Sequence, residues 1–501
     1  MEFSEDQGRA WARIERTLNA SGIDLPGASL LPDGGPQPTL AVLGRAGSGK
    51  TLLLAELVKA VTAAGVETIS AEYESRKTRT RRTLAVLAPT NKAASVLRGR
   101  GVPATTIHRI LYTPLYDPEY EAIAEWLSGR AERPKVAALD GAGLDRAHAF
   151  YRRHPSIPGA LASAGLRGSD FILGWKRRDE PLDIGLVDEA SMLDARLYGD
   201  LRELFATLVL FGDPAQLAPV GQGTAMVFEA LPAEAKLTLS RVHRQASDSP
   251  ILDLADALAD PDLRFEDFER MVERAAARDA RVVVSPRADA GTMARSPVLV
   301  WRNVTRIRLI SAFRAAHGVP DLALAPGEPL VCDGIELPLK HRRKRMDLEA
   351  RGLIKGAQVI YVGPGARPGF ARLHVVGAED PRVGVASIIQ IEAPGEAEPR
   401  IVSAASMGAV FLHGAAVTIH KAQGSQWPTV QVFAPDLWAA AQSGRSEAGV
   451  ALWKRLAYVA VTRAEERLVW VTRYAMARPT TPLGIADLPA TAPPLELAAE
   501  D

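Results

Sequence analysis

At residues 44–51 the chain reads GRAGSGKT, and this segment constrains the fold more than any other part of the sequence. The apolar run 40–43 before it predicts a buried strand, and the leucine-rich run 52–58 after it predicts a helix. A glycine-rich turn that leads from a strand into a helix directs backbone N–H groups at phosphate oxygens. The segment therefore predicts a P-loop that is carried by an α/β fold and binds a nucleotide.

The P-loop combines glycines with one ammonium group and two hydroxyl groups. Lys50 is long enough to reach the β- and γ-phosphates, and the Thr51 hydroxyl is placed to hold Mg²⁺. The N-terminus of the predicted helix adds partial positive charge to the site. The residues expected to wrap the phosphates with their backbone are Gly44, Gly47, Ser48 and Gly49.

A pair of acidic residues completes the predicted site. The apolar run 184–187 predicts a second buried strand, and Asp188 and Glu189 follow it directly. Asp188 is placed to hold Mg²⁺, directly or through water, and Glu189 to polarise the water that attacks the γ-phosphate. Together with the P-loop the pair predicts nucleotide hydrolysis, whereas an acidic pair by itself is typical of a solvated turn.

Length, charge and cysteine content exclude several other classes of protein. The chain has 501 residues, enough for several domains, and a net charge of +1, so any nucleic-acid contact must come from local patches. Cys332 is the single cysteine, which excludes an intrachain disulfide and a multi-cysteine metal cluster and is typical of a reducing cytoplasm. The N-terminus is polar and acidic, and no apolar run is long enough to cross a membrane.

The alternation of predicted strands and helices is interrupted twice. One interruption mixes aromatic and basic residues, and the other consists of short β-rich runs between turn signals, which predict a small SH3-like β-barrel. A final segment rich in Pro, Ala and Thr is predicted to be disordered. The predicted parts are a first α/β domain at 1–112 and 184–235, an accessory subdomain at 113–183, a second α/β domain at 236–330 and 411–475, the barrel at 331–410 and the tail at 476–501.

Several short blocks follow the P-loop in a fixed order. They are PTNKAA at 89–94, TIH at 106–108, VDEAS at 187–191, GDPAQL at 212–217, RQ at 244–245, TIHKAQGS at 418–425 and YVAVTRA at 458–464. In this order the blocks resemble the motifs of superfamily 1 DNA helicases of the RecD/Dda type, a 5′-to-3′ group of P-loop NTPases. The resemblance implies two RecA-like parallel-sheet domains in tandem with ATP between them, and it places the accessory subdomain where such enzymes carry a strand-separating pin.

The resemblance implies further residues at the ATP site. Gln7 resembles the glutamine that reads the adenine, because an amide can pair with both a donor and an acceptor on the base edge. Gln216 resembles the glutamine that couples the γ-phosphate to movement. Arg244 and Arg463 resemble arginine fingers, whose guanidinium forks stabilise charge on the transferred phosphoryl group.

Other blocks imply a path for a nucleic-acid strand. Hydroxyl, imidazole and ammonium groups suit contacts with phosphate and sugar, which carry no sequence information. Two basic runs, 76–82 and 340–345, have no role in the resemblance, and Gln426 stands where many relatives have glutamate for a ribose contact. The residues implied on the strand path are Pro89, Thr90, Asn91, Thr106 and His108 in the first domain, and Thr418, His420 and Lys421 in the second.

The sequence thus predicts an ATP- and Mg²⁺-dependent motor that translocates on single-stranded DNA and unwinds tailed duplex DNA. The 5′-to-3′ direction comes from the resemblance alone. Three alternatives stay open: an RNA-directed helicase of the same superfamily, a binding protein with a degenerate ATPase, and a motor subunit of a larger nuclease or replication complex. Intact Lys50, Glu189 and Gln216 argue against the degenerate ATPase. Replication or repair proteins are the further partners that such a function would bring, and no membrane partner is expected.

Overall fold

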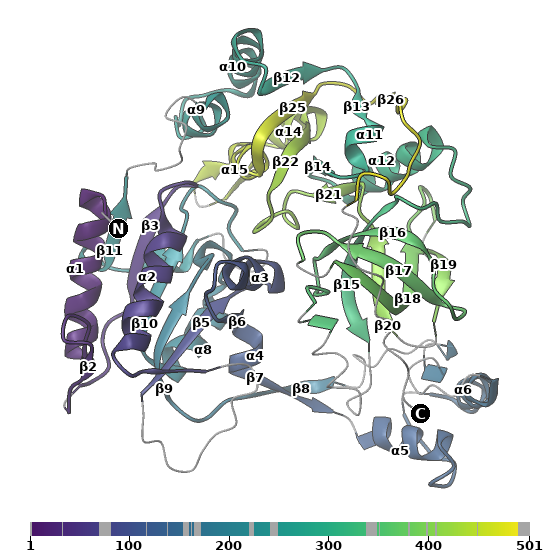
Figure 1. Ribbon diagram of the computed structural model, residues 1–501, viewed down its shortest axis with the longest axis horizontal. Helices are drawn as coiled ribbons and strands as arrows, with labels where there is room; N and C mark the ends of the chain where they lie inside the picture. The colour runs from purple at the N-terminus through teal and green to yellow at the C-terminus, as the bar shows by residue number, and fades with distance from the viewer. Residues whose placement is uncertain are drawn as a thin grey trace. The chain divides into compact units, whose positions relative to one another are not determined.

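A computed structural model of the chain is drawn as a ribbon in Figure 1. The contacts within the chain divide it into two units. The first unit consists of Met1–Thr113, Arg177–Ser285 and Ile419–Thr472, and the second of Pro114–Lys176, Pro286–Thr418 and Arg473–Asp501. The structure describes residues 3–32, 34–69, 82–116, 118–137, 139–153, 160–161, 163–164, 172–219, 225–240, 249–336, 348–349, 351–378, 381–396, 399–405, 408–447 and 449–488.

The first unit contains the sheet that the P-loop predicts. Its strands are β3 (Leu40–Gly44), β4 (Glu67–Thr68), β5 (Thr83–Ala88), β6 (Ala104–Thr106), β9 (Leu182–Val187), β10 (Phe205–Gly212) and β11 (Lys236–Leu239). All are parallel, in the order β11-β3-β10-β9-β5-β4, with β6 beside β5. This arrangement brings the C-terminal ends of the strands to one edge, where α/β proteins bind their ligands.

Alternate side chains along each strand pack on opposite faces of this sheet. In β3, Leu40 and Val42 belong to the core on one face, whereas Ala41 and Leu43 belong to the core on the other. Because helices cover both faces, the whole of β3 is buried, as is usual for parallel sheets. The loops that leave the sheet therefore start from a rigid core.

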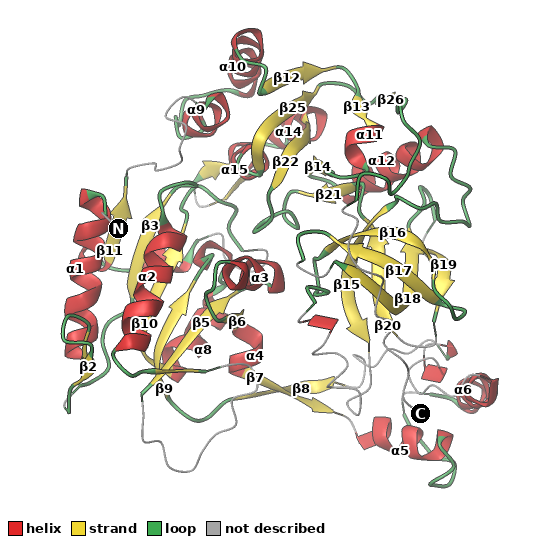
Figure 2. Cartoon of the chain, in the orientation of Figure 1, coloured by secondary structure: helices red, strands yellow, loops and turns green. Residues whose placement is uncertain are grey.

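Helices flank the sheet, as the alternation of red and yellow segments in Figure 2 shows. Residues of the first three helices of the unit join the core of Leu40 and Val42, and residues of two later helices join the core of Ala41 and Leu43. The first group is α1 (Glu5–Ala20), α2 (Lys50–Ala63) and α3 (Asn91–Gly99), and the second is α4 (Ile107–Leu111) and α8 (Ala195–Leu204).

The C-terminal part of the first unit adds a second parallel sheet. Its strands in this unit are β12 (Val282–Ser285), β22 (Trp427–Phe433) and β25 (Ala464–Val471), with β25 in the middle. The helices of this part are α9 (Pro250–Ala257), α10 (Phe265–Arg278), α14 (Ala434–Gln442) and α15 (Leu452–Val461). All residues of α15 are buried, so this helix is an internal element. The expected α/β class with parallel sheets is confirmed.

The second unit contains a β-rich insertion, as the turn signals in 331–410 predict. Five of its strands are β15 (Pro329–Glu336), β16 (Gln358–Pro364), β17 (Phe370–Val375), β18 (Arg382–Ile391) and β20 (Gly408–His413), and β19 (Arg400–Ala404) pairs with β18 from outside. Pairings of β15 with β16, β16 with β17, β17 with β18, β18 with β20 and β20 with β15 close a ring. Buried and half-buried residues alternate along β18, because every second side chain points into the ring. The basic run 340–345 lies outside the described residues.

Shorter elements make up the rest of the second unit. The described residues of 114–176 include two helices with a small core of their own, and a two-stranded sheet at the base of this insertion. A parallel strand pair and a helix flank the β-rich insertion in the sequence. These elements are α5 (Pro118–Leu127), α6 (Gly141–Arg153), β7 (Tyr112–Tyr116), β8 (Ile172–Arg177), β14 (Val298–Val300), α12 (Asn303–Ala316) and β21 (Ala416–Thr418).

The segment 476–501, which its composition predicts to be disordered, is attached in its described part. Strand β26 (Met476–Ala477) pairs in parallel with β13 (Ala288–Asp289), and Arg295 forms an ion pair with Asp487 at 2.6 Å. These residues are held by main-chain hydrogen bonds and by the ion pair with Arg295. Such contacts do not require an apolar sequence pattern, so composition did not predict them. In the part of the chain that the structure describes, no helix has the length and apolar character needed to cross a membrane.

Candidate nucleotide and nucleic-acid sites

The P-loop leaves the C-terminal end of β3 and enters α2, as predicted. Gly47 and Gly49 have φ angles of 85° and 81°, in the left-handed region that favours glycine. A Cβ atom on Gly44 would come within 2.3 Å of Ser48 Oγ, so this position also requires glycine. Gly49 precedes the first residue of α2, which places the turn against the helix N-terminus.

The polar side chains of the loop have hydrogen-bonding capacity to offer a phosphate group. Lys50 Nζ donates to the carbonyl oxygens of Gly44, at 2.5 Å, and Arg45, at 3.0 Å, and so lies along the loop. Ser48 Oγ is buried and has no hydrogen-bond partner among the described residues. A buried hydroxyl without a partner costs about 1–3 kcal/mol, and a phosphate oxygen would remove that cost. The loop therefore fits an anionic ligand.

Gln7, predicted to read the adenine, contacts the P-loop. It lies in the first turn of α1 and is only 2% exposed. Its Nε2 donates to the carbonyl oxygen of Ser48 at 3.4 Å, and its Oε1 accepts the backbone N–H of Ser4 at 3.1 Å, which completes a capping box. Each end of the amide is engaged once, which leaves one N–H donor and one acceptor lone pair for the edge of a base.

Asp188 and Glu189 follow β9 at the same edge of the sheet. Burial of Asp188, together with the charge of Glu189, raises the pKa of the Asp188 carboxyl group to about 7. Glu189 has a φ of 51°, a left-handed conformation that costs a non-glycine residue roughly 1–3 kcal/mol. Backbone strain and a desolvated acid are both typical of functional sites.

Gln216 lies beside Glu189. Its Nε2 donates to Glu189 Oε2 at 3.2 Å, whereas its Oε1 is buried without a hydrogen-bond partner in the described part of the chain. Ser191 fixes the start of the loop that carries Gln216, because its Oγ accepts the N–H of Asp213 at 2.8 Å and donates to the Asp213 carbonyl at 2.9 Å. The structure thus brings together the residue predicted to polarise water and the residue predicted to sense the γ-phosphate.

Thr51 and Asp188 are the residues that could hold Mg²⁺. Hydroxyl and carboxylate oxygens are hard ligands of the kind that Mg²⁺ prefers, with water and substrate phosphates in its other positions. The buried negative charge of Asp188 beside Glu189 is one that a divalent cation would offset. Within the described residues no group of three or more His, Cys, Asp or Glu side chains forms a metal site. An ion held by Thr51 and Asp188 would therefore depend on the nucleotide for further ligands.

Of the two predicted arginine fingers, only Arg463 lies among the described residues. Arg463 is 5% exposed and follows α15. Its guanidinium group donates to the carbonyl oxygens of Val459, at 3.0 Å, and Ser425, at 3.1 Å, and to Thr462 Oγ1 at 3.1 Å. In this structure Arg463 therefore bonds to the main chain of α15 and of the loop at Ser425. Arg244 lies outside the described residues.

Part of the predicted strand path lies at the C-terminal ends of β5 and β6. These strands pair in parallel with Ala88 opposite Thr106, so the loop that starts at Pro89 and the helix α4 leave the sheet side by side. His108 is exposed on α4, whereas Thr106 is buried. The structure therefore brings Pro89 and His108 to the same edge as the P-loop.

Thr90 and Asn91 lie at the beginning of α3. Thr90 Oγ1 accepts the backbone N–H of Ala93 at 3.1 Å and so caps this helix, while Asn91 is its first residue. The Thr90 hydroxyl, predicted to contact a strand, thus already has a structural task. Its remaining donor capacity is still open to a phosphate oxygen.

The loop that carries His420 and Lys421 lies against the beginning of α3. A Cβ atom on Gly424 would stand 3.6 Å from the Cβ of Ala93, which is ordinary van der Waals contact. Lys421 is exposed, and burial lowers the pKa of His420. Thr418, the remaining predicted contact, ends β21 in the second unit and is described there.

Two family models match the chain in the regions that carry these sites. Residues 35–281 match an AAA domain, and residues 413–471 match the UvrD-like helicase C-terminal domain. Together they cover more than half of the chain and include the P-loop, the acidic pair, the Gln216 loop and the loop of His420. The chain belongs to helicase superfamily 1. As a member of this superfamily, the helicase is an ATP-hydrolysing enzyme.

Solved structures of Pif1 helicases are similar to this helicase at low sequence identity. Pif1 from Candida albicans is 15% identical with a TM-score of 0.48, and the alignment covers 95% of this chain and 98% of that chain. Bacteroides Pif1 in complex with ADP-AlF3 and ssDNA is 14% identical with a TM-score of 0.46, covering 94% of this chain and 92% of that chain. A comparison with curated proteins finds no match.

Sequence reasoning assigned no role to Arg455 and Tyr458 of the helicase, both on α15. The Tyr458 hydroxyl donates to Asp213 at 2.8 Å, and Arg455 donates to the carbonyl oxygens of Pro214 and Gln216. The block YVAVTRA includes the end of this helix. A sequence pattern, however, does not show which loop a buried hydroxyl or guanidinium group contacts.

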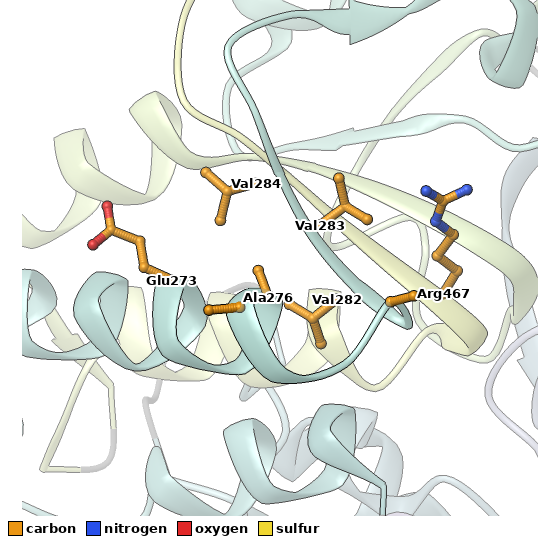
Figure 3. Close-up of a pocket in the computed structure, with 8 residues that line it drawn as sticks. Glu273, Ala276, Val282, Val283, Val284 and Arg467 are labelled. Carbon is orange, nitrogen blue, oxygen red and sulfur yellow. The ribbon is translucent and has the colours of Figure 1, made fainter.

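An open hollow of about 400 Å³ on the first unit lies away from all of these residues (Figure 3). It is lined by α10, β12 and Arg467 of β25, and the side chains of Glu273 and Arg467 lie on opposite sides of it. It contains no residue of the P-loop, the acidic pair or the predicted strand path.

Proposed function

We propose that this helicase moves along single-stranded DNA and unwinds tailed duplex DNA with the free energy of ATP hydrolysis. The order of its motifs supports a motor, and the exposed His108 and Lys421 support a strand that is held by its backbone. Such contacts do not read sequence, so binding would tolerate any base and weaken steeply with salt.

The contacts of Arg463 are the observation that carries this proposal. Its guanidinium group holds the carbonyl oxygen of Ser425, in the loop that also bears His420 and Lys421. The same side chain is predicted to meet the γ-phosphate as an arginine finger. If Arg463 turns to a phosphate and releases Ser425, nucleotide binding would change the loop that is predicted to hold the strand. A motor requires such a link between its two ligands.

Hydrolysis in this site would use residues that are already adjacent. Lys50 would exchange the carbonyl oxygens of Gly44 and Arg45 for phosphate oxygens, and Glu189 would polarise the attacking water. The Oε1 of Gln216, which has no partner among the described residues, can accept a hydrogen bond from that water. Bound by Thr51 and Asp188, Mg²⁺ would neutralise charge on the β- and γ-phosphate oxygens.

Four finer features belong to the same proposal. The closed ring of β15 to β18 and β20 would be a barrel of the SH3 type, and the insertion after residue 113 would serve as the strand-separating pin. Translocation would run 5′ to 3′, as the RecD/Dda motif order implies. A cytoplasmic location suits Cys332, which is buried and is the only cysteine.

An unwinding assay on four substrates tests the proposal. The substrates are duplexes with a 5′ or a 3′ single-stranded tail, each in a DNA and an RNA version, with Mg²⁺ and ATP. We expect unwinding of the 5′-tailed DNA duplex alone. Unwinding of 3′-tailed DNA would reverse the polarity, unwinding of RNA would favour the RNA-directed alternative, and no unwinding with intact ATPase activity would contradict an autonomous motor.

A further inference from the structure

Helix α15 contacts the nucleotide loops through the hydroxyl group of Tyr458. This hydroxyl donates to Asp213 Oδ2 at 2.8 Å and accepts the backbone N–H of Ala46, in the P-loop, at 3.0 Å. Tyr458 is 3% exposed and Asp213 is 1% exposed. Burial raises the pKa of Tyr458, so its hydroxyl stays protonated and can donate to the carboxylate. One oxygen atom therefore joins the P-loop to the loop that carries Gln216.

Arg455, one turn earlier on the same helix, contacts the same loop through its backbone. Its Nη1 donates to the carbonyl oxygens of Gln216, at 2.5 Å, and Pro214, at 3.1 Å, and its Nε donates to the carbonyl oxygen of Glu447 at 3.0 Å. The side chain is 3% exposed. A buried guanidinium group held by three carbonyl oxygens has little freedom, so Arg455 fixes the Gln216 loop relative to α15.

The other end of α15 leads to the predicted strand path. Arg463, two residues after the helix, donates to the carbonyl oxygen of Ser425 in the loop of His420 and Lys421. All of these residues belong to the first unit. One buried helix thus has hydrogen bonds to the P-loop, to the Gln216 loop and to the loop predicted to hold the strand.

We propose that Tyr458 and Arg455 are positioning residues that transmit nucleotide binding from the P-loop and the Gln216 loop to the strand-binding loop through α15. This inference rests on the proposed function, because it concerns a strand that the helicase would bind. Neither residue is assigned to touch the transferred phosphoryl group. They act through hydrogen bonds between the two loops and the helix, so that a rearrangement of either loop acts on α15.

A physical reason favours transmission over mere structural support. The N–H of Ala46 is one of the P-loop donors, and in this structure Tyr458 occupies it. A nucleotide that reorders the P-loop changes the partner of the Tyr458 hydroxyl and so acts directly on α15. Because allosteric coupling is a difference in free energy between two states, the loss of a bond that exists in one state alone changes the coupling.

The test measures the coupling between two ligands in the full-length chain. The dissociation constant of a fluorescent oligo-dT strand is measured with and without AMP-PNP and Mg²⁺, and that of AMP-PNP with and without the strand. We expect the wild type to show the same factor in both directions, in the range of roughly 5- to 150-fold. In Tyr458→Phe and in Arg455→Met the factor should fall below about twofold, and Arg455→Lys should recover part of it.

Two controls separate positioning from a loss of structure. Tyr198→Phe, on α8, removes a hydroxyl from a partly buried tyrosine in the same unit, and should keep the wild-type factor. Thermal melting shows whether each variant is folded. A folded Tyr458→Phe variant that binds both ligands with the wild-type factor would overturn the inference. A wild type that fails to bind the strand would overturn the proposed function, and the inference with it.

Discussion

The nucleotide loops and the loops predicted to bind the strand are held in different ways. Ser48, Asp188 and Gln216 are each at most 8% exposed, and their neighbours fix them by hydrogen bonds or by burial. By contrast, His108 and Lys421 are exposed on short elements at the surface. The first region presents a few buried groups at defined positions, and the second presents several groups to solvent.

This difference sets how much each residue can contribute. A buried group acts in a low-dielectric environment, where one charge or hydrogen bond is worth far more than in water. An exposed group competes with water and salt, so each contact with a strand adds little. Single substitutions should therefore be severe at the nucleotide loops and mild along the strand path, and the following predictions test this contrast.

The largest effect is expected for Lys50→Ala. Removing the ammonium group that is placed to reach the phosphates should lower ATP turnover more than about a thousandfold. Steady-state ATPase activity with saturating single-stranded DNA measures this. Lys59→Ala is a matched control, because Lys59 lies on the same helix and pairs with Glu56 at the surface. Wild-type turnover in Lys50→Ala would refute the P-loop assignment.

If Arg463 is the arginine finger that the motif order implies, Arg463→Ala should be nearly as severe, with turnover reduced on the order of a thousandfold. The affinity for ATP should change little, because the finger stabilises the transition state. Turnover and nucleotide affinity are measured separately, with Arg467→Ala on the exposed face of β25 as the control. A pure loss of affinity would mean that Arg463 holds the nucleotide in its ground state.

Glu189→Gln should lower turnover roughly a hundredfold, because an amide is a poor base for polarising water. Binding of ATP and Mg²⁺ should persist, since Asp188 and Lys50 remain. Single-turnover hydrolysis and nucleotide titration distinguish the two steps, and Glu229→Gln, at an exposed position, serves as the control. Near-normal turnover would move the catalytic role to another residue.

On the strand path the effect should be smaller. The double substitution His108→Ala with His420→Ala should weaken single-strand binding about thirtyfold, because two polar contacts of about 1 kcal/mol each are lost. DNA-stimulated ATPase activity should fall in parallel. Titration of oligonucleotides of several sequences at two salt concentrations measures both affinity and salt dependence. A strong preference for one sequence, or an unchanged affinity, would place the strand elsewhere.

The smallest effect concerns Thr90. Because Thr90 Oγ1 caps α3, Thr90→Ala should lower the stability of folding by about 1 kcal/mol. Thr90→Ser keeps the capping hydroxyl and should restore the melting temperature. If Thr90→Ala instead leaves stability unchanged and strongly weakens strand binding, the main role of the Thr90 hydroxyl is to contact the strand and not to cap α3.

The local parts of the fold followed from the sequence. A run of apolar residues, a glycine-rich turn and a helix with its N-terminus at Lys50 are set by short-range periodicity and by the φ angles that Gly47 and Gly49 adopt. A role for Gln216 at the ATP site was implied only by a resemblance, and its hydrogen bond to Glu189 was not predicted. The attachment of 476–488 was missed, because composition reports apolar content and not main-chain pairing.

By itself, the sequence determined which chemistry the chain can perform, since residue types and their spacing define the P-loop and the acidic pair. Only the tertiary structure decided how those groups are connected. Tyr458 reaches Asp213 across 245 residues, and Arg455 reaches the backbone of Gln216 across 239 residues. Arg455 donates to backbone carbonyl oxygens, which every residue has, so a pattern of side chains in the sequence could not predict this contact. Such bonds form because α15, which packs against β22 and β25 of the second sheet, directs side chains to loops that are distant in the sequence.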